Sequence, residues 1–463
     1  MKLKKYKSAI VIFCLIFFTT SCKKSFFTDV NINPNVVSSV PPGQLLSTVE
    51  AALAYTQGGD ISRYSSLFMQ QVYGNASQSQ AYYIYNVNPG VFDNLWPDLY
   101  TSTMENDYSL IQISDAGNYN EYSGISRILM AYTLQVAVDL WGDIPYSEAF
   151  RGNLKDQNLH PVFDNGKALY DTITSLINVG INMLNNPAAG TLVPGGEDVI
   201  YGGNAAQWIK FAHAIKARLA LHQSKGNAAM ATQALAEIAL SFKSNADNAQ
   251  YIFGTAETAA NPWYQFNRDR PGDETFSPST LAKRMLASND PRYNIFFDPT
   301  NETKGKKGNH YGGLNDYYGS VNSPVEFITY DELQFASAEA TLRATGNFAT
   351  AQAFYEAGIK ANMEKLGVST GAINTYVAAN GTLPTTSVDA AIAQVASQEF
   401  IALFLNPEAW TLWRRTNSPA LTPTAGSAIP RRLLWPQSEY SYNAANAPKT
   451  NTLTSPRIFW DTP

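Results

Sequence analysis

Asp139 and Asp143 are the two carboxylates in this 463-residue sequence whose spacing most suggests acid–base chemistry. They bracket a Leu-Trp-Gly segment, and two positioned carboxylates can serve a glycosidase as acid and base. The same four-residue spacing at the end of a helix is more typical of capping and ion pairing. We therefore expect a structural role for the pair, with a glycan hydrolase as the alternative.

Other catalytic and metal-binding patterns are missing from the sequence. It contains no HExxH, GxSxG, GxGxxG or Walker pattern, and its four histidines are scattered at positions 160, 213, 222 and 310. His213 and His222 fall on different faces of one predicted helix, so they predict no metal pair. The segment from Asp298 to His310 lacks the Gly and the terminal Glu of an EF-hand loop. The sequence thus predicts a protein that is not an enzyme and has no catalytic residues, cofactor or metal ligands.

The first 22 residues form a secretory signal that ends on a cysteine. Four lysines precede an apolar run over residues 9–18, which is too short to span a membrane. Three small residues, Thr19 to Ser21, then lead into Cys22, and this ending resembles a bacterial lipoprotein signal. The resemblance implies cleavage before Cys22 and acylation of Cys22. An ordinary signal peptide with an incidental cysteine is the alternative.

Charge and composition restrict the class of partner. The net charge is −5, and removal of the signal lysines makes it more negative. Binding to nucleic acid needs clustered cations that neutralise phosphates, and the one short basic run, Lys304 to Lys307, is more typical of a solvated turn. We expect no nucleic-acid partner. Because only 15 % of residues are charged and 12 % are aromatic, the composition favours neutral ligands over phosphates.

Most secondary-structure elements of the chain are predicted to be helices. The predicted fold class is therefore mainly all-α. Between residues 204 and 225, apolar residues recur at steps of three and four, the period of one helix face. Asn204 can cap the start of this helix, and Gly226 can end it. Further helices are predicted over residues 44–57, 60–73, 92–114, 123–140, 165–185, 228–243, 279–287, 330–345, 348–366, 386–403 and 406–415.

Long irregular stretches separate these helices and are rich in Gly, Pro, Asn and Tyr. They cover residues 74–91, 186–203, 244–278, 288–329 and 416–463. Loops of this length in a compact protein are usually functional or face a partner. The predicted organisation is a lipoprotein signal peptide over residues 1–21, a lipidated cysteine and polar tether over 22–41, and one helical domain over 42–463.

A repeat pattern points to paired helices. Gly346 and Asn347 form a predicted turn, the small residues Ala351 and Gly358 follow it, and Phe335 lies on the preceding helix. Tetratricopeptide hairpins place small residues at such points because their two helices cross closely. The segment from Lys225 to Ala231 offers a second, weaker copy. A partial scaffold of tetratricopeptide-like hairpins is therefore expected.

Seven segments occur in one order along the chain and together resemble the SusD/RagB family of outer-membrane lipoproteins, especially its SusD-like branch with an Asn-Pro-Asn start. They are DVNINPN at 29–35, DLWGDIPY at 139–146, the Trp-led helix at 208–221, DPR at 290–292, the Tyr-x-Glu helix at 330–342, the Trp-x-x-x-Arg-Arg-Thr segment at 410–419 and the tail at 429–436. The aromatic residues of these motifs, such as Trp141, Trp208, Phe335 and Trp410, are expected in the core. Arg414 and Arg415 are expected to pair with carboxylates or to cap a helix.

The resemblance implies a helical SusD-like fold with four tetratricopeptide-like hairpins. It also implies a surface lipoprotein of the Bacteroidetes type, attached to the cell outer membrane by its lipid anchor. Its partner would be a SusC-like TonB-dependent β-barrel that imports glycans or peptides, over which the lipoprotein closes like a lid. Lys23 and Lys24 stand where the family often has acidic residues for surface export, so the surface and periplasmic faces both stay open.

A ligand site is expected in the irregular segments, where aromatic side chains lie among polar neighbours. The candidates are Tyr82, Tyr83, Tyr85, Trp263, Tyr264, Arg268, Tyr317 and Tyr318. Flat rings can pack on sugar faces. Arg268 and the neighbouring amides can bond hydroxyls or carbonyls; these amides are Gln78, Gln80, Asn86, Gln265 and Asn315. The alternative is that these rings pack their loops onto the body. An oligosaccharide is preferred to a peptide because few loop charges accompany the rings. A membrane-anchored glycan hydrolase and a gating adaptor without strong ligand binding are the competing functions.

Overall fold

A computed structural model describes residues 40–152 and 157–463 of the chain. Residues 42–463 form one compact unit that is mainly helical, which confirms the predicted fold class. Cys22, the predicted signal peptide and nearly all of the predicted tether lie outside the described residues. Within the described ranges, no helix combines the length and apolar character that a bilayer crossing requires.

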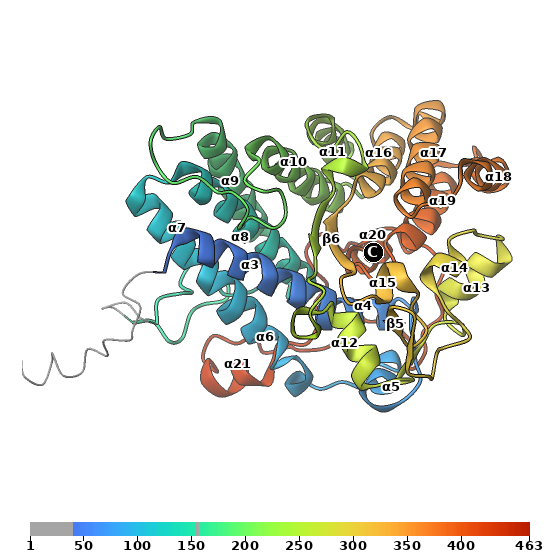
Figure 1. Cartoon of the computed structure of the whole chain (residues 1–463), viewed down its shortest axis with the longest axis horizontal. Helices are drawn as coiled ribbons and strands as arrows, with labels where there is room; N and C mark the ends of the chain where they lie inside the picture. Colours follow the sequence, from blue (N-terminus) through green and yellow to red (C-terminus); the bar gives the residue numbers. More distant parts are fainter. Residues whose placement is uncertain (1–39, 153–156) are drawn as a thin grey trace, which may run out of the picture. The chain divides into compact units, whose positions relative to one another are not determined.

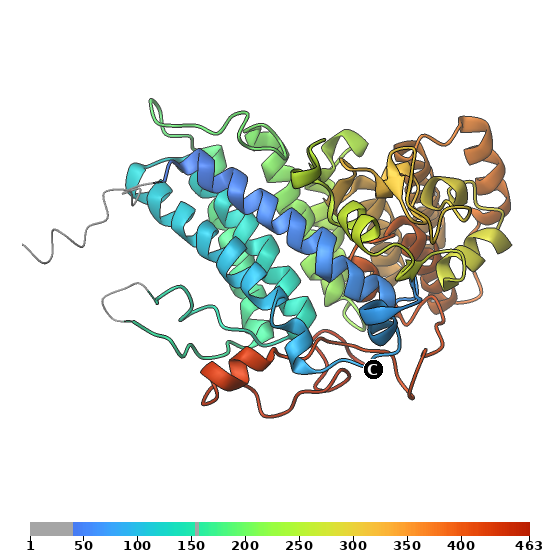
Figure 2. The ribbon, with the colours of Figure 1, turned by 60° about the horizontal axis from the view of Figure 1, so that its bottom comes forward.

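The long helices follow the predicted periodicity closely, except α18, where no helix is predicted. Most of the others begin or end within a few residues of the predicted positions. They are α3 (Pro42–Thr56), α7 (Glu105–Gly117), α8 (Asn120–Trp141), α9 (Gly166–Asn185), α10 (Ala205–His222), α11 (Ala228–Leu240), α16 (Tyr330–Thr345), α17 (Phe348–Lys365), α18 (Thr370–Asn380), α19 (Val388–Ala402) and α20 (Glu408–Thr416). Figure 1 shows α9, α10, α11, α16 and α17 following one another along the upper edge of the compact unit, and Figure 2 shows α3 running beside α7.

Short elements fill the opposite side, below the long helices in Figure 1. The short helices are η1 (Gln57–Ile61), α4 (Ser62–Phe68), α5 (Ser77–Tyr83), η2 (Pro89–Phe92), α6 (Leu95–Pro97), η3 (Asp98–Met104), η4 (Asn245–Asp247), η5 (Glu257–Ala259), α12 (Pro262–Asp269), α13 (Thr280–Ala287), α14 (Tyr293–Phe296), α15 (Asp316–Gly319) and α21 (Gln437–Tyr442). Three antiparallel pairs of strands join β1 (Tyr73–Gly74) to β3 (Glu274–Thr275), β2 (Ala249–Ile252) to β6 (Pro324–Ile328), and β4 (Lys306–Lys307) to β5 (His310–Tyr311).

The predicted hairpin at residues 330–366 is confirmed. Gly346 ends α16 in the left-handed conformation with φ of 65°, and the Asn347 side chain accepts a hydrogen bond from the Thr350 amide at the start of α17. A Cβ atom on Gly358 would lie 2.8 Å from the Phe335 ring. The two helices therefore cross at a distance that only glycine permits. The weaker second copy is also a hairpin, formed by α10 and α11 around Gly226.

The aromatic residues of the ordered motifs lie in the core, as expected. Trp141, Trp208, Phe335 and Trp410 are all fully buried. Each indole N–H still finds an acceptor: Trp141 donates to the Leu434 carbonyl at 2.9 Å, and Trp410 donates to the Pro430 carbonyl at 2.8 Å. These bonds tie α8 and α20 to the carboxyl-terminal tail, so the motifs hold the fold together.

Arg415 and Arg414 behave differently. The Arg415 guanidinium makes a two-pronged ion pair with Glu339, with both N···O distances 2.9 Å. Arg414 instead donates to the backbone carbonyls of Asp139 and Arg431, at 2.6 and 3.0 Å. The expected carboxylate pairing is thus confirmed for Arg415. The expected capping is confirmed for Arg414, since the Asp139 carbonyl lies in the last turn of α8.

The predicted irregular stretches contain short helices that sequence periodicity did not reveal. The expectation of irregular chain is wrong for α5, α12, α14, α15 and α21, which have four to eight residues each. The helical period is recognised over windows of about 11 residues or more, so elements of this length leave no clear pattern. The predicted helix over residues 92–114 is likewise divided, because the π-helical turn η3 follows Pro97 within it.

Candidate functional site

The two carboxylates at the end of α8 have structural partners. The Asp139 carboxylate accepts hydrogen bonds from the Tyr170 hydroxyl at 2.6 Å and the Trp460 indole at 2.9 Å. The Asp143 carboxylate accepts from the Gly166 amide at 2.8 Å, at the first residue of α9. Asp139 borders a cavity of only about 20 Å³. The positions of both groups match the capping and packing interpretation of this pair.

The three candidate tyrosines near α5 make contacts within the protein. Tyr82 is 9 % exposed and meets the Tyr64 ring edge-on. Tyr83 is half-buried against Tyr73, with 4.9 Å between ring centres. The Tyr85 hydroxyl accepts a hydrogen bond from the Thr424 amide. All three therefore hold α5 and the following turn against neighbouring segments.

The candidates on α12 also have partners in the protein. Trp263 and Tyr264 are almost fully buried. The Tyr264 hydroxyl donates to Glu257 at 2.6 Å, and Arg268 forms ion pairs with Glu257 and Asp269 at 2.8 and 2.7 Å. Because Arg268 already has two carboxylate partners, it is poorly placed to act as a free hydrogen-bond donor.

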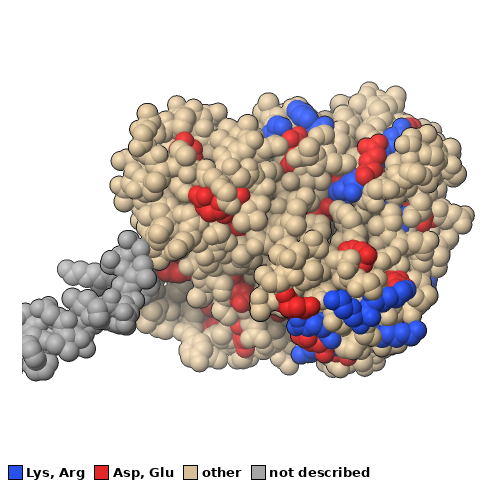
Figure 3. Space-filling view, in the orientation of Figure 1, with Lys and Arg blue, Asp and Glu red and all other residues tan. Residues whose placement is uncertain are grey.

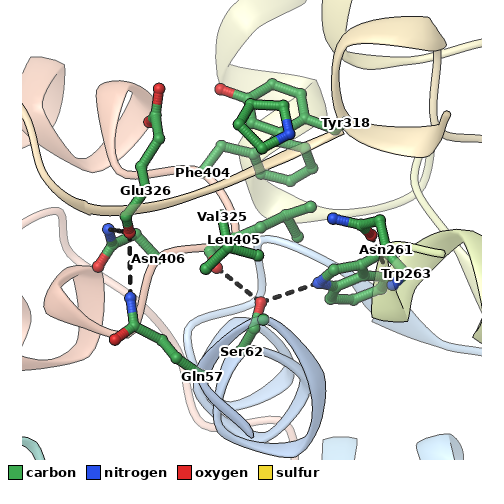
Figure 4. A pocket seen from close by; sticks show the side chains of 12 residues that line it. Gln57, Ser62, Asn261, Trp263, Tyr318, Val325, Glu326, Phe404, Leu405 and Asn406 are labelled. Atoms are coloured by element: carbon green, nitrogen blue, oxygen red, sulfur yellow. Dashed lines mark hydrogen bonds between the residues drawn. The ribbon is translucent and has the colours of Figure 1, made fainter. Parts of the chain in front are cut away.

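Trp263 and Tyr318 meet at an internal cavity (Figure 4). The Ser62 hydroxyl accepts a hydrogen bond from the Trp263 indole at 2.9 Å and donates to the Leu405 carbonyl at 2.6 Å. The Tyr318 hydroxyl is buried with no hydrogen-bond partner among the described residues. Tyr317, next to it, donates to Glu326 at 3.2 Å. The cavity measures about 30 Å³, which suits an ordered water rather than a sugar.

A much larger hollow lies along the part of α12 that Gln265 and Phe266 occupy, and we call it the Tyr55 groove. It has two lobes of about 400 and 340 Å³, within the size range of small-molecule sites. Both lobes are lined by Tyr55, Thr56, Asp98 and Gln265; Ser102, Tyr251, Phe253 and Ala260 extend one lobe, and Asp60, Arg63, Phe266, Asp269 and Arg270 extend the other.

Two π-helical turns shape this groove. At the end of α3, η1 contains Gly59 with φ and ψ of −91° and −110°, which kinks the chain. A Cβ atom on Gly58 would lie 2.3 Å from the Val325 side chain, so β6 can approach η1 only at a glycine. On the other side, η3 presents Asp98 and Ser102. Single π-helical turns are frequent at functional sites. The presence of two such turns at one hollow therefore favours this groove as the ligand site.

Tyr55 and Asp98 are the groove residues best placed to contact a ligand. The Tyr55 ring is 49 % exposed, and its hydroxyl donates to the Gln265 side chain at 3.3 Å. Burial, together with the carboxylate of Asp60, raises the pKa of Asp98. Within residues 40–152 and 157–463, no cation or hydrogen-bond donor reaches the Asp98 carboxylate. It is therefore a free acceptor beside an exposed ring, a combination that suits a sugar.

The arginines of the groove have other partners. Arg63 is buried, and its guanidinium lies 3.1 Å from Glu274, 3.4 Å from Asp60 and 3.7 Å from the centre of the Phe266 ring. The Arg270 guanidinium lies 5.8 Å from the centre of the same ring. On the face shown in Figure 3, basic side chains gather at the lower right, whereas acidic side chains predominate to their left.

The sequence singles out three loop segments, and the Tyr55 groove includes part of one of them. Gln265, one of the predicted polar neighbours, lines both lobes. The other groove residues Tyr55, Asp98, Tyr251, Phe253 and Phe266 are not among the residues that the sequence singles out. Tyr55 lies at the end of a predicted helix, so it resembled a packing residue, although the adjacent Gly58-Gly59 pair marked a break between two predicted helices.

Two further features of the described chain bear on ligand binding. No group of three or more His, Cys, Asp or Glu side chains within these residues is arranged to hold a metal ion. A further hollow of about 440 Å³ lies beside Trp96, Tyr100 and Phe150. There the Tyr100 hydroxyl donates to the Pro145 carbonyl at 2.7 Å, and the Tyr100 ring packs between Trp96 and Phe150, with ring centres 4.6 and 6.3 Å away.

Comparisons with known proteins agree with one another. A family profile, SusD-like, described as starch-binding and associating with the outer membrane, matches residues 34–436. A chitin-binding protein of known structure shares 24 % identity and a TM-score of 0.75, covering 91 % of this chain and 100 % of its own. A chitin-binding SusD homologue from Flavobacterium johnsoniae shares 21 % identity and a TM-score of 0.72, covering 91 % and 97 %.

A SusD/RagB family protein from Bacteroides thetaiotaomicron is similar to the same degree. It shares 22 % identity and a TM-score of 0.72, covering 91 % of this chain and 99 % of its own. At these identities the structural likeness shows the fold. None of the curated proteins matches the chain.

Proposed function

The chain belongs to the SusD-like family, and from this premise we propose that it is a lipid-anchored outer-membrane protein that binds oligosaccharides and delivers them to a SusC-like TonB-dependent transporter. The observation that carries the binding role is the Tyr55 groove, where an exposed aromatic ring lies beside a carboxylate that has no partner among the described residues. The names of two similar structures, both chitin-binding, support a glycan over a peptide.

We place ligand contact at Tyr55, Asp98 and Gln265. A sugar face can pack on the Tyr55 ring, and sugar hydroxyls can donate to Asp98 and to the Gln265 carbonyl oxygen. Binding without hydrolysis is the activity that we propose, since Asp139 and Asp143 are both engaged in bonds that hold α8, α9 and the tail.

Calorimetry with starch- and chitin-derived oligosaccharides tests the binding role. Removal of the ring in Tyr55→Ala should weaken binding about tenfold, or about 1.4 kcal/mol. Trp263→Ala and Tyr83→Ala serve as the comparison, because they probe residues that pack within the protein. If these two variants lose affinity while Tyr55→Ala keeps it, the site lies with the residues chosen from the sequence rather than in the groove.

Membrane attachment through Cys22 is tested by fractionation. We expect Cys22→Ala to move the protein from the membrane fraction to the supernatant, because the acyl chains would be lost. The matched variant Ser25→Ala, three residues along the tether, should stay with the membrane. Firm attachment of Cys22→Ala would contradict the lipid anchor.

The transporter partnership is tested by affinity purification from native membranes. A stable complex buries on the order of 1,200–2,000 Å² or more, and the short helices and loops opposite the hairpins supply such a surface. We expect a large β-barrel protein to co-purify. Repeated recovery of the lipoprotein alone would count against the partnership.

A further inference from the structure

The charges around Tyr55 indicate which sugars the groove favours. Three carboxylates, those of Asp60, Asp98 and Asp269, line the lobe that contains the Tyr55 ring. Burial and these same three carboxylates raise the pKa of the Tyr55 hydroxyl, while Arg268 opposes them. Three carboxylates thus lie close enough to the exposed ring to act on its hydroxyl group.

Two of the arginines near the Tyr55 ring already have carboxylate partners. Arg63 is held by Glu274 and Asp60, and Arg268 is held by Glu257 and Asp269. Arg270, which is exposed, lies over Phe266. The remaining titratable groups on the walls are Tyr55 and Tyr251. Among the described residues, Asp98 is thus the wall carboxylate for which no cation or donor is present.

Resting on the proposed function, we propose that the Tyr55 groove prefers oligosaccharides of amino sugars with a free ammonium group over their N-acetylated forms. An ammonium group donates three hydrogen bonds, so it can bond Asp98 while lying near the face of Tyr55, where a cation is attracted by the ring. An N-acetyl group is neutral and adds bulk at the same position. It offers the half-buried carboxylate a single neutral N–H donor in place of the charged group.

A lysine side chain carries the same ammonium group, but the groove fits a sugar better. Its lobes present a ring face and the Gln265 amide within a hollow of several hundred cubic ångströms, which suits a sugar ring that carries several hydroxyl groups. The experiment includes a lysine peptide to distinguish the two sources of the ammonium.

The test is calorimetry of the full-length protein with N,N′,N″-triacetylchitotriose, with its fully de-N-acetylated form and with a trilysine peptide at pH 6.5. We expect the deacetylated trimer to bind about tenfold more tightly than the acetylated one. The preference should shrink at pH 9, because a sugar amine, like an α-amino group, loses its proton at about pH 8. It should also fall with added salt.

The variant Asp98→Asn should abolish most of this preference, so that the two trimers bind with similar affinities. Asp171→Asn removes the same charge from an exposed position on α9 and should leave the preference unchanged. Retention of the full preference in Asp98→Asn would overturn the role of that carboxylate.

Other outcomes separate this inference from the proposed function. If both trimers bind equally and Tyr55→Ala weakens both, the inference fails while the glycan-binding role stands. Tighter binding of trilysine than of either trimer would overturn the choice of a sugar. If no glycan binds the wild-type protein at all, the proposed function fails and the inference fails with it.

Discussion

In the core around Arg343 and Arg415, the buried carboxylate of Glu339 has cationic partners, whereas the Tyr55 groove contains a carboxylate without one among the described residues. In the core, Glu339 is fully buried and lies between Arg415 and Arg343, with N···O distances of 2.9 and 2.7 Å. In the groove, Asp98 is about half-buried and has no counter-charge in contact within the described residues. Removing a charge from water costs several kcal/mol unless a partner compensates it. We therefore interpret Glu339, which is paired, as a residue that stabilises the fold. We interpret Asp98, which is unpaired among the described residues and lies beside an exposed ring, as a ligand-binding residue.

The largest effect is expected in the core. Arg415→Leu would leave Glu339 buried with only Arg343 as a partner, and breaking a buried pair typically costs about 3–5 kcal/mol. Urea unfolding followed by circular dichroism measures this loss. The control Lys360→Leu breaks the exposed pair with Glu356 and should cost about 1 kcal/mol or less. If both variants lost the same free energy of unfolding, the buried ion pair would contribute no more stability than the exposed one.

Acid should weaken the same core. Although burial opposes ionisation, Arg415 and Arg343 lower the pKa of Glu339 to about 2 from 4.5. A lowered folded-state pKa contributes stability above pH 4.5 that is lost as the pH falls from about 4.5 towards 2, on the order of 3 kcal/mol. Unfolding free energies measured across this range should decline less steeply in Glu339→Gln than in the wild type. Parallel declines would show that Glu339 is not an important acid-sensitive group.

The crossing of α16 and α17 provides a smaller test. Gly358→Ala would place a Cβ atom 2.8 Å from the Phe335 ring, and overpacking of this kind costs about 1–3 kcal/mol. Gly371→Ala, also on a helix but with no atom within 4 Å of the added Cβ, should be neutral or stabilising by up to about 1 kcal/mol. Thermal melting of both variants measures the difference, and a stable Gly358→Ala would contradict the close crossing.

The smallest effect on stability is expected in the groove. The pKa of Asp98 is raised in the folded protein, so its ionised form slightly disfavours folding near neutral pH and this cost disappears as the pH falls. Asp98→Asn should therefore leave the unfolding free energy within about 0.5 kcal/mol of the wild type or raise it. A loss as large as that of Arg415→Leu would mean that Asp98 has a structural partner.

The helical hairpins and the buried aromatic core could be predicted from the sequence, because they depend on regular spacing of residues. The hairpin around Gly346 was read from small residues at fixed spacing, and the buried tryptophans were read from motifs that occur in a constant order. Gly358 and Phe335 make the hairpin recognisable, because two helices that cross so closely need a small residue on one helix opposite a large residue on the other.

The groove could not be predicted in the same way. Tyr55, Asp98 and Phe266 come from three elements that are far apart in sequence and are brought together by the kink at Gly59 and the turn after Pro97. Whether a tyrosine faces the body or the solvent depends on that packing: Trp263 and Tyr264 point inward, whereas Gln265 on the same helix lines the groove. No local pattern distinguishes these neighbours.

A crystal structure of the protein with a bound chitin-derived trimer tests the central claim most directly. The account predicts electron density for a sugar ring against Tyr55, with a polar sugar atom within about 3.2 Å of the Asp98 carboxylate. Density for the sugar beside Trp96 and Tyr100, or at the residues of α5, with the Tyr55 groove empty, would contradict it.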